Sequence, residues 1–351
     1  MRATLLGELG VLLSRLGHWD EAESMLAEAS GLFRELGRWD TREGVQTRAA
    51  LAVAKWDQGR IAECRSLLDP LLAHAQAPSE VPDVTRFEIL AATGFVLAET
   101  GDPKSGEVRL REALEFAQRL PDEEQYRLRS VQVSLAASLL RQARHPEAAE
   151  LIEPLCRELA PLLPHGNTVA LDAFNVRGRL RLETGRTEAA LGDFESALAA
   201  AEAKLGAQHP RSINLTNNLA TCLIALARWG EAEDLLRHAI EVSTESLGED
   251  SRETLTALSN LGSVLIGTGR YGEAEEVLRW ALDKELAQSG EVGQRTALAR
   301  SNLAICLYHL QRFGEAADLQ ALALESVSPD TAEYPLMESA LALYRKLAAG
   351  N

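Results

Sequence analysis

The chain repeats itself with a period of 42 residues. Steps of 42 in both directions from Gly269 reach one equivalent position in each of eight copies, most often a glycine: Gly17, Gly59, Gly101, Ala143, Gly185, Ala227, Gly269 and Gln311. The residue five positions later is small in every copy: Ala22, Cys64, Gly106, Ala148, Ala190, Ala232, Ala274 and Ala316. So is the residue seven positions earlier: Gly10, Ala52, Gly94, Ala136, Gly178, Ala220, Gly262 and Ala304. An uninterrupted period of this length is typical of stacked supersecondary units.

Each copy is predicted to form two helices joined by a turn at the glycine position. Apolar residues recur at 3.6-residue spacing on both sides of that turn, which indicates two amphipathic helices. The two small positions are predicted to mark where the helices cross, because only a small side chain lets two backbones approach closely. The residue nine positions after the turn position is expected to pack against these small residues. It is large and apolar in every repeat except the last, which has glutamine: Leu26, Leu68, Leu110, Ile152, Phe194, Leu236, Leu278 and Gln320.

Local signals predict where the helices end and where they are irregular. Gly248 suits a helix C-terminus, and Asp250 with Glu253 predicts a capping box at the start of the next helix. Pro70 and Pro154 occupy equivalent points inside a second helix. Each removes a backbone hydrogen bond and predicts a kink, so we expect a less regular N-terminal half.

The spacing of small residues, the "GRYGEAEE" type of turn and the later Leu or Phe resemble the tetratricopeptide repeat, whose usual period is 34. The longer period, with "NNLA" and "SLGEDSRET", is similar to repeats of kinesin light chains and many bacterial signalling proteins. The resemblance implies an all-α, right-handed solenoid of eight helix-turn-helix repeats in one domain spanning 1–351. The expected repeats are 3–44, 45–86, 87–128, 129–170, 171–212, 213–254, 255–296 and 297–338, with a capping helix at about 330–349.

In this family the first helices of the repeats line a concave groove in which partner segments bind. In the last three repeats the corresponding residues are polar and almost uncharged: Asn214, Asn217, Asn218, Thr221, Thr256, Ser259, Asn260, Ser263, Ser301, Asn302, Ile305 and Tyr308. Asparagine both donates and accepts hydrogen bonds, which suits an extended peptide backbone of any sequence. The alternative is that Asn218, Asn260 and Asn302 bind neighbouring helices and fix the stacking.

Two further groups of inner-face residues have a functional and a structural interpretation. Trp56 and Phe95 either anchor an apolar partner segment or close the N-terminal half on itself. Arg141 and Arg179 either clamp a carboxylate or phosphate in the groove or are paired within the chain.

Arg177 and Arg181 stand where most other repeats have leucine. An arginine at a tight apolar crossing needs a partner, and we expect one in a carboxylate such as Asp193 or Glu183. The resemblance to kinesin light chains implies a more continuously basic groove than this sequence shows. We therefore do not expect this chain to bind the cargo of kinesin light chains.

Composition narrows the class of partner. The 52 acidic and 36 basic residues give a net charge of −16, which repels nucleic acid and anionic membranes. No signal peptide is recognised, and Cys64, Cys156, Cys222 and Cys306 are far apart, so we expect a cytoplasmic chain without a disulfide framework.

We therefore expect a non-catalytic scaffold that binds a protein or peptide, as the docking or sensory module of a bacterial signalling system. Motifs of metalloproteases, serine hydrolases and phosphate- or dinucleotide-binding loops are absent, and neither a cofactor nor a metal is expected. The first repeat starts near Met1 without a preceding cap, which points to one part of a longer parent protein. The alternatives are a self-assembling structural solenoid, stacked end to end, and a peptide-responsive regulator whose effector domain is absent from this chain.

Overall fold

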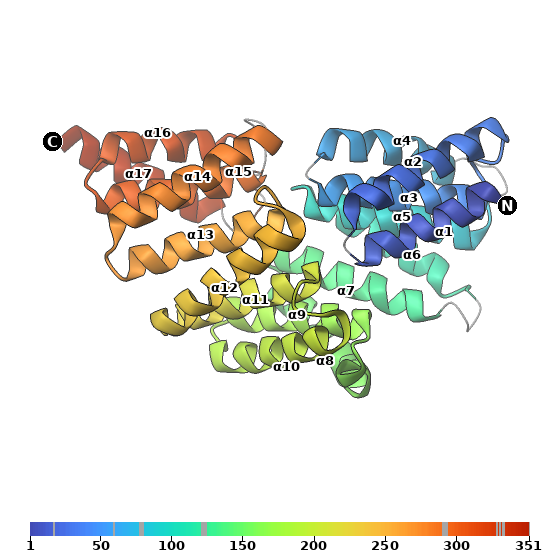
Figure 1. The fold of residues 1–351 in the computed structure, drawn as a ribbon, viewed down its shortest axis with the longest axis horizontal. Helices are drawn as coiled ribbons and strands as arrows, with labels where there is room; N and C mark the ends of the chain where they lie inside the picture. Colours follow the sequence, from blue (N-terminus) through green and yellow to red (C-terminus); the bar gives the residue numbers. More distant parts are fainter. Residues whose placement is uncertain are drawn as a thin grey trace. The chain divides into compact units, whose positions relative to one another are not determined.

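A computed structural model describes residues 1–16, 18–58, 60–76, 81–120, 125–289, 294–327, 329, 331 and 334–350. Within those ranges the regular structure is entirely helical, with seventeen α-helices and one 3₁₀ helix, which confirms the predicted fold class. Consecutive helices pack against each other in pairs, such as α1 with α2, α5 with α6 and α15 with α16 (Figure 1).

The first helix of each repeat carries an odd number. These first helices are α1 (Arg2–Leu16), α3 (Arg42–Asp57), α5 (Asp83–Glu99), α7 (Gln125–Arg141), α9 (Thr168–Glu183), α11 (Pro210–Ala225), α13 (Arg252–Gly267) and α15 (Gln294–His309). The second helices are α2 (Trp19–Glu35), α4 (Ile61–Gln76), α6 (Pro103–Ala117), α8 (His145–Leu159), α10 (Thr187–Leu205), α12 (Trp229–Leu247), α14 (Tyr271–Ser289) and α16 (Phe313–Leu324). Every second helix begins 42 residues after the previous one, so the sequence period is also a structural period.

The turn between the two helices of a repeat is left-handed in six repeats. The residue before the N-cap has a positive φ, between 55° and 92°, at Gly101, Ala143, Gly185, Ala227, Gly269 and Gln311. Gly17 and Gly59, the first two members of this series, lie outside the described residues. Glycine adopts this conformation at little cost, whereas alanine and glutamine at the same position are strained by it.

The predicted crossing positions are all buried, and the larger residue packs directly on them. A Cβ atom added to Gly262 would lie 2.5 Å from Cδ2 of Leu278, and one added to Gly178 would lie 2.7 Å from the ring of Phe194. The missing side chain is therefore what lets the two helices of a repeat cross so closely.

The chain forms two compact units, residues 1–157 and 158–351. In the N-terminal unit, Ala52, Cys64, Leu68 and Ile89 belong to one core cluster. Helices α4 and α8 continue through Pro70 and Pro154. The C-terminal unit begins with the last two residues of α8 and the 3₁₀ helix η2 (Ala160–His165).

The last helix, α17 (Tyr334–Gly350), packs against α16 and has the place of a capping helix. It buries Leu341 and Tyr344 as expected, while Leu347 is half-buried. The predicted capping box at α13 is wrong by one residue. The hydroxyl of Ser251 caps the helix by accepting a hydrogen bond from the Thr254 amide, and Asp250 pairs with Lys284 instead.

None of the helices within the described ranges is long and apolar enough to cross a membrane.

Candidate partner-binding surface

The first helices form one face of each unit, called here the inner face. Neighbouring first helices contact one another: α1 with α3 and α5 with α7 in the N-terminal unit, and α11 with α13 and α13 with α15 in the C-terminal unit. Among the described residues, the backbones of successive second helices do not approach each other as closely. Helices that approach more closely on one side of a stack curve it toward that side, so the inner face is the concave side of each unit.

The inner face of the C-terminal unit carries uncharged polar side chains in rows with the 42-residue period. One row is Asn214, Thr256 and Leu298; the next is Asn218, Asn260 and Asn302; the third is Thr221, Ser263 and Ile305. All nine side chains are at least partly exposed to solvent. The polar character decreases at α15, where Leu298 and Ile305 are 41% and 38% exposed.

Three asparagines form a small hydrogen-bonded network between α9 and α11. Nδ2 of Asn218 donates to Oδ1 of Asn175 at 2.7 Å, and Nδ2 of Asn175 donates to Oδ1 of Asn214 at 3.3 Å. Nδ2 of Asn260 donates to the backbone oxygen of Asn217 at 3.4 Å, linking α13 to α11. Asn218 and Asn260 thus contact neighbouring helices, as the structural alternative expects, while part of each side chain stays exposed.

Asn217 is placed differently from its neighbour Asn218. Its side chain is 2% exposed and donates to the backbone oxygen of Glu253 at 3.2 Å, so it joins α11 to α13 inside the stack. Ser301 also points inward, to the buried Gln320 at 3.0 Å. Asn217 therefore stabilises the stacking of two repeats, and Ser301 the packing of α15 on α16 within one repeat.

Arg177 and Arg181 have the structural role expected of them, with Asp193 as their shared partner. The guanidinium of Arg177 makes two bonds to the carboxylate, at 2.7 and 3.0 Å, and Arg181 adds a third at 2.8 Å. The Arg177 guanidinium also lies 4.4 Å from the ring centre of Phe174. The buried Asp193 is satisfied by these two cations.

Arg141 and Arg179 belong to different compact units. Arg141 ends α7 and forms an ion pair of two hydrogen bonds with Glu99 of α5, at 2.5 and 3.2 Å. Arg179 is half-buried on α9. A basic spot made by these two residues stays a prediction, and Arg141 would have to leave Glu99 to take part in it.

Trp56 and Phe95 pack edge to face in the N-terminal unit, with ring centres 5.1 Å apart. Both are half-buried against the core of α3, α4 and α5. The pair therefore helps to hold α3 to α5 and leaves only part of each ring for a partner.

Sequence reasoning missed a buried carboxylate on the inner face of the N-terminal unit. Glu88 of α5 accepts a hydrogen bond from Gln46 at 2.6 Å and pairs with Arg42 and Arg127. Burial raises the pKa of Glu88 although these three partners oppose the shift. The period was the available signal, because Gln46 and Glu88 occupy the same repeat position as Asn214.

Sequence reasoning also missed a ladder of ion pairs between repeats. An arginine at the start of a second helix pairs with a glutamate 37 positions earlier, in the preceding second helix. The four ladder pairs are Arg60–Glu23, Arg144–Glu107, Arg270–Glu233 and Arg312–Glu275. In the last three, a second arginine four residues after the glutamate completes a triad.

The four cysteine thiols are buried and unsuited to nucleophilic chemistry. Burial raises the pKa of Cys222 to about 12 and that of Cys306 to about 11. A thiol with so high a pKa is almost entirely protonated at neutral pH. No group of three or more potential metal ligands occurs within the described part of the chain.

Comparison with known families identifies the repeat. Models of the tetratricopeptide repeat match residues 2–36, 45–70, 170–245, 211–284 and 259–331. The chain belongs to the tetratricopeptide repeat family. Tetratricopeptide repeats are protein-interaction modules, and none of the matching models describes a catalytic family. A comparison with curated protein sequences gives no match.

Solved structures extend the tetratricopeptide solenoid over the whole chain. A Rap protein in complex with competence and sporulation factor matches 99% of this chain and 99% of its own, with a TM-score of 0.66 and 14% identity. The repeats of a putative kinesin light chain from Podosopora anserina cover 60% of this chain and 98% of their own, with a TM-score of 0.47 and 19% identity. BtubC from P. vanneervenii covers 70% of this chain and 90% of its own, with a TM-score of 0.49 and 17% identity. At such identities the likeness concerns the fold.

Proposed function

We propose that this tetratricopeptide repeat protein is a non-catalytic scaffold that holds an extended peptide or a segment of a partner protein on the inner face of its C-terminal unit. The observation that carries the proposal is the periodic set of partly exposed, uncharged side chains on α11, α13 and α15, which are polar except for Leu298 and Ile305. In a chain of net charge −16, an uncharged face of this kind favours contact with peptide groups over contact with ions.

The proposed contact residues are those of the three rows together with Ser259 and Tyr308. Asn217 and Ser301 are left out because their side chains bind inside the stack. A peptide carbonyl can replace the Asn217 carbonyl as the acceptor for Nδ2 of Asn260, since that bond is long, at 3.4 Å, and partly exposed. The amide donors and acceptors of each asparagine side chain that are not bonded within the protein would each bind a peptide group of the extended partner.

The likeness to the Rap protein, which is bound to a peptide factor in its structure, supports a peptide as the partner. We further propose a cytoplasmic location and a docking or sensory role in bacterial signalling. The partner would be a separate protein or peptide, or another domain of a larger parent.

The test uses the full chain and a displayed library of extended, uncharged peptides. Selected peptides are synthesised, and their affinity is measured for the wild type and for a variant carrying Asn260→Ala and Asn302→Ala. We expect the affinity to fall at least tenfold, since each lost bond to a peptide group costs about 1 kcal/mol. Ser246→Ala on the exposed side of α12 is the matched control and should change nothing. Equal affinity for both proteins would contradict the proposal.

A further inference from the structure

Three arginines at the junction of the first two repeats have no acidic partner. Arg34 lies in the last turn of α2, Arg38 in the turn that follows, and Arg48 on α3. Within the described part of the chain, no carboxylate oxygen lies within 4.0 Å of a side-chain nitrogen of any of the three, although Glu35 and Asp40 adjoin them in the sequence. Most other arginines form ion pairs, such as those of the ion-pair ladder. The charge of these three is therefore not neutralised by direct pairing.

Arg48 is unusual because its charge is also buried. The residue is 8% exposed, and its Nε is buried without a hydrogen-bond partner. Nη2 donates to the backbone oxygen of Leu67 at 3.5 Å, which is long for a hydrogen bond. The guanidinium lies over the ring of Trp39, 5.8 Å from the ring centre. Burial and repulsion from Arg34 lower the pKa of Arg48, since a buried charge without a carboxylate partner is unfavourable.

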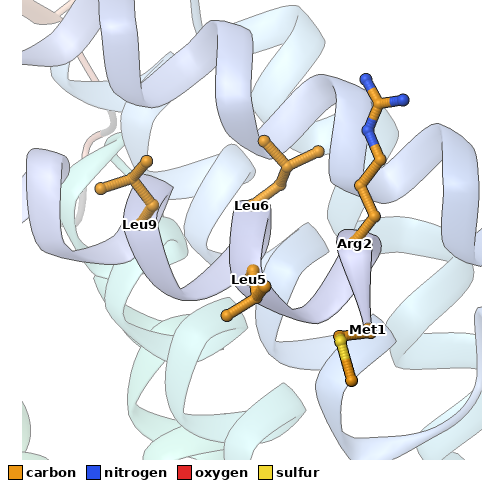
Figure 2. A pocket seen from close by; sticks show the side chains of 5 residues that line it. All are labelled: Met1, Arg2, Leu5, Leu6 and Leu9. Atoms are coloured by element: carbon orange, nitrogen blue, oxygen red, sulfur yellow. The ribbon is translucent and has the colours of Figure 1, made fainter.

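The period shows that the repeat does not require an arginine at the position of Arg48. In the first repeat the equivalent residue is Leu6, which lines a mainly apolar hollow together with Leu5 and Leu9 (Figure 2). Helix packing alone therefore does not explain the buried charge of Arg48. The equivalent residues in the later repeats are Leu90, Gln132, Phe174, Thr216, Leu258 and Arg300.

The turn between α2 and α3 holds the other two arginines near Arg48. Gly37 has a φ of 64° and its amide donates to the backbone oxygen of Arg34 at 3.0 Å, so the chain reverses between Arg34 and Arg38. Both arginines are exposed. Trp39, which follows Arg38 in the chain and lies under the Arg48 guanidinium, meets a histidine ring of α4 edge to face, with ring centres 5.2 Å apart. The turn and its indole thus place exposed positive charge beside the buried charge.

We propose that Arg34, Arg38 and Arg48 bind a phosphate group, supplied as free phosphate or as a phosphate monoester. A guanidinium donates paired hydrogen bonds to a phosphate. A phosphate monoester carries about two negative charges at neutral pH and three acceptor oxygens, whereas a carboxylate carries one charge and two oxygens. Three guanidinium groups without an acid therefore match a phosphate better than a carboxylate. The bound dianion would offset the buried charge of Arg48.

Isothermal titration calorimetry of the full chain tests the proposal. The probes are inorganic phosphate, N-acetyl-phosphoserine amide as the monoester, and acetate as the carboxylate. The ionic strength is kept constant, because added salt screens the attraction between the arginines and any anion. We expect saturable binding of a phosphate probe that is at least tenfold tighter than binding of acetate. Tighter binding of the monoester would identify a phosphorylated molecule as the ligand, and tighter binding of inorganic phosphate would identify the free ion.

Two variants and a control assign the binding to these arginines. Arg48→Leu introduces the residue that other repeats have at this position and should weaken phosphate binding at least tenfold, the loss of about one charge-assisted hydrogen bond. Arg34→Gln changes an exposed side chain and should weaken binding about threefold, as for an exposed ion pair, so it decides the question even if Arg48→Leu folds poorly. Arg65→Gln is the matched control and should leave the affinity unchanged. It removes the same charge from an exposed position of α4, about 200° around the helix from Leu67.

Three results would overturn the proposal: no saturable binding of either phosphate probe, acetate bound as tightly as phosphate, or unchanged phosphate affinity in Arg34→Gln and Arg48→Leu. Helical content and melting temperature of each variant show that a loss of binding is not a loss of fold. Peptide binding on the inner face of the C-terminal unit involves other residues, so failure of the phosphate site leaves the proposed function standing.

Discussion

Arg177 and Asp193 show how one repeat can replace an apolar pair by an ion pair. Six of the other seven repeats have leucine at the position of Arg177, and six have an apolar residue at that of Asp193. In this repeat the two side chains are 11% and 6% exposed. The arginine could be recognised from the sequence as a residue in need of a partner. The choice of Asp193 over Glu183 could not, because it depends on the rotation of α10.

The ion pair predicts a double-mutant cycle. Asp193→Leu leaves two guanidinium groups without their buried carboxylate and should cost about 3 kcal/mol of unfolding free energy. Adding Arg177→Leu restores the apolar pair of the other repeats and should recover most of that loss. Urea denaturation measures both, and a double variant as unstable as Asp193→Leu alone would contradict this account.

The left-handed turn residues predict a stabilising substitution. Ala227 has a φ of 55°, a conformation that costs an alanine about 1 kcal/mol and glycine almost nothing. Ala227→Gly should therefore raise the unfolding free energy, by less than about 1 kcal/mol because glycine also gains entropy in the unfolded chain. Ala199→Gly, at an exposed position inside α10, is the control and should lower it by about 1 kcal/mol. A loss of stability at both sites would refute the explanation.

At the scale of the helix, the period predicts well where each helix lies in the sequence. It predicts poorly in which direction each side chain points around the helix axis. The second helices begin at intervals of 42 residues, as the crossing positions require. A step of one residue turns a side chain by about 100° around the helix, and this is where sequence reasoning fails. Asn217 points into the stack while Asn218 lies on the inner face, and the cap of α13 is Ser251 and not Asp250.

The ion-pair ladder predicts a pH-dependent contribution to stability. Hydrogen bonds from Arg237 and Arg270 lower the pKa of Glu233, so its contribution is present above the pKa of an unfolded glutamate and is lost as the pH falls through the folded value. Glu233→Gln should destabilise the chain at pH 7, by no more than about 1 kcal/mol for a pair near the surface.

The measurement is urea denaturation of wild type and variant at pH 7 and at pH 3. The difference between them should shrink at pH 3, because the contribution of Glu233 is lost progressively as the pH falls below the pKa of an unfolded glutamate. Asp234→Asn, at the exposed neighbouring position, is the control and should show no such change. A difference independent of pH would count against the ladder.

At the scale of the whole molecule, one period supplies both the core and the proposed binding surface. Each repeat buries its crossing residues and leaves several residues of its first helix at least partly exposed, so each row of the inner face gains one residue per repeat. The sequence predicted most residues of these rows in the C-terminal unit, but it omitted Leu298 and included Asn217 and Ser301, whose side chains bind inside the unit. It did not predict the buried carboxylate of Glu88 on the inner face of the N-terminal unit, whose ion pairs connect α3, α5 and α7.

The cysteines give a probe of opening of the whole fold. All four are buried, with the pKa of Cys222 raised to about 12 and that of Cys306 to about 11. We expect a thiol reagent such as Ellman's reagent to react slowly with the native chain at pH 7 and to titrate all four thiols in urea. Rapid reaction of one thiol in the native chain would show a reactive site that this structure does not contain.

Hydrogen exchange tests the central claim, that the first helices of the C-terminal unit form the binding surface. Exchange of the full chain is followed by mass spectrometry with and without a selected peptide. Bound peptide should slow exchange in α11, α13 and α15 and leave α10, α12 and α14 unchanged. Protection confined to the second helices, or to α1, would contradict the claim.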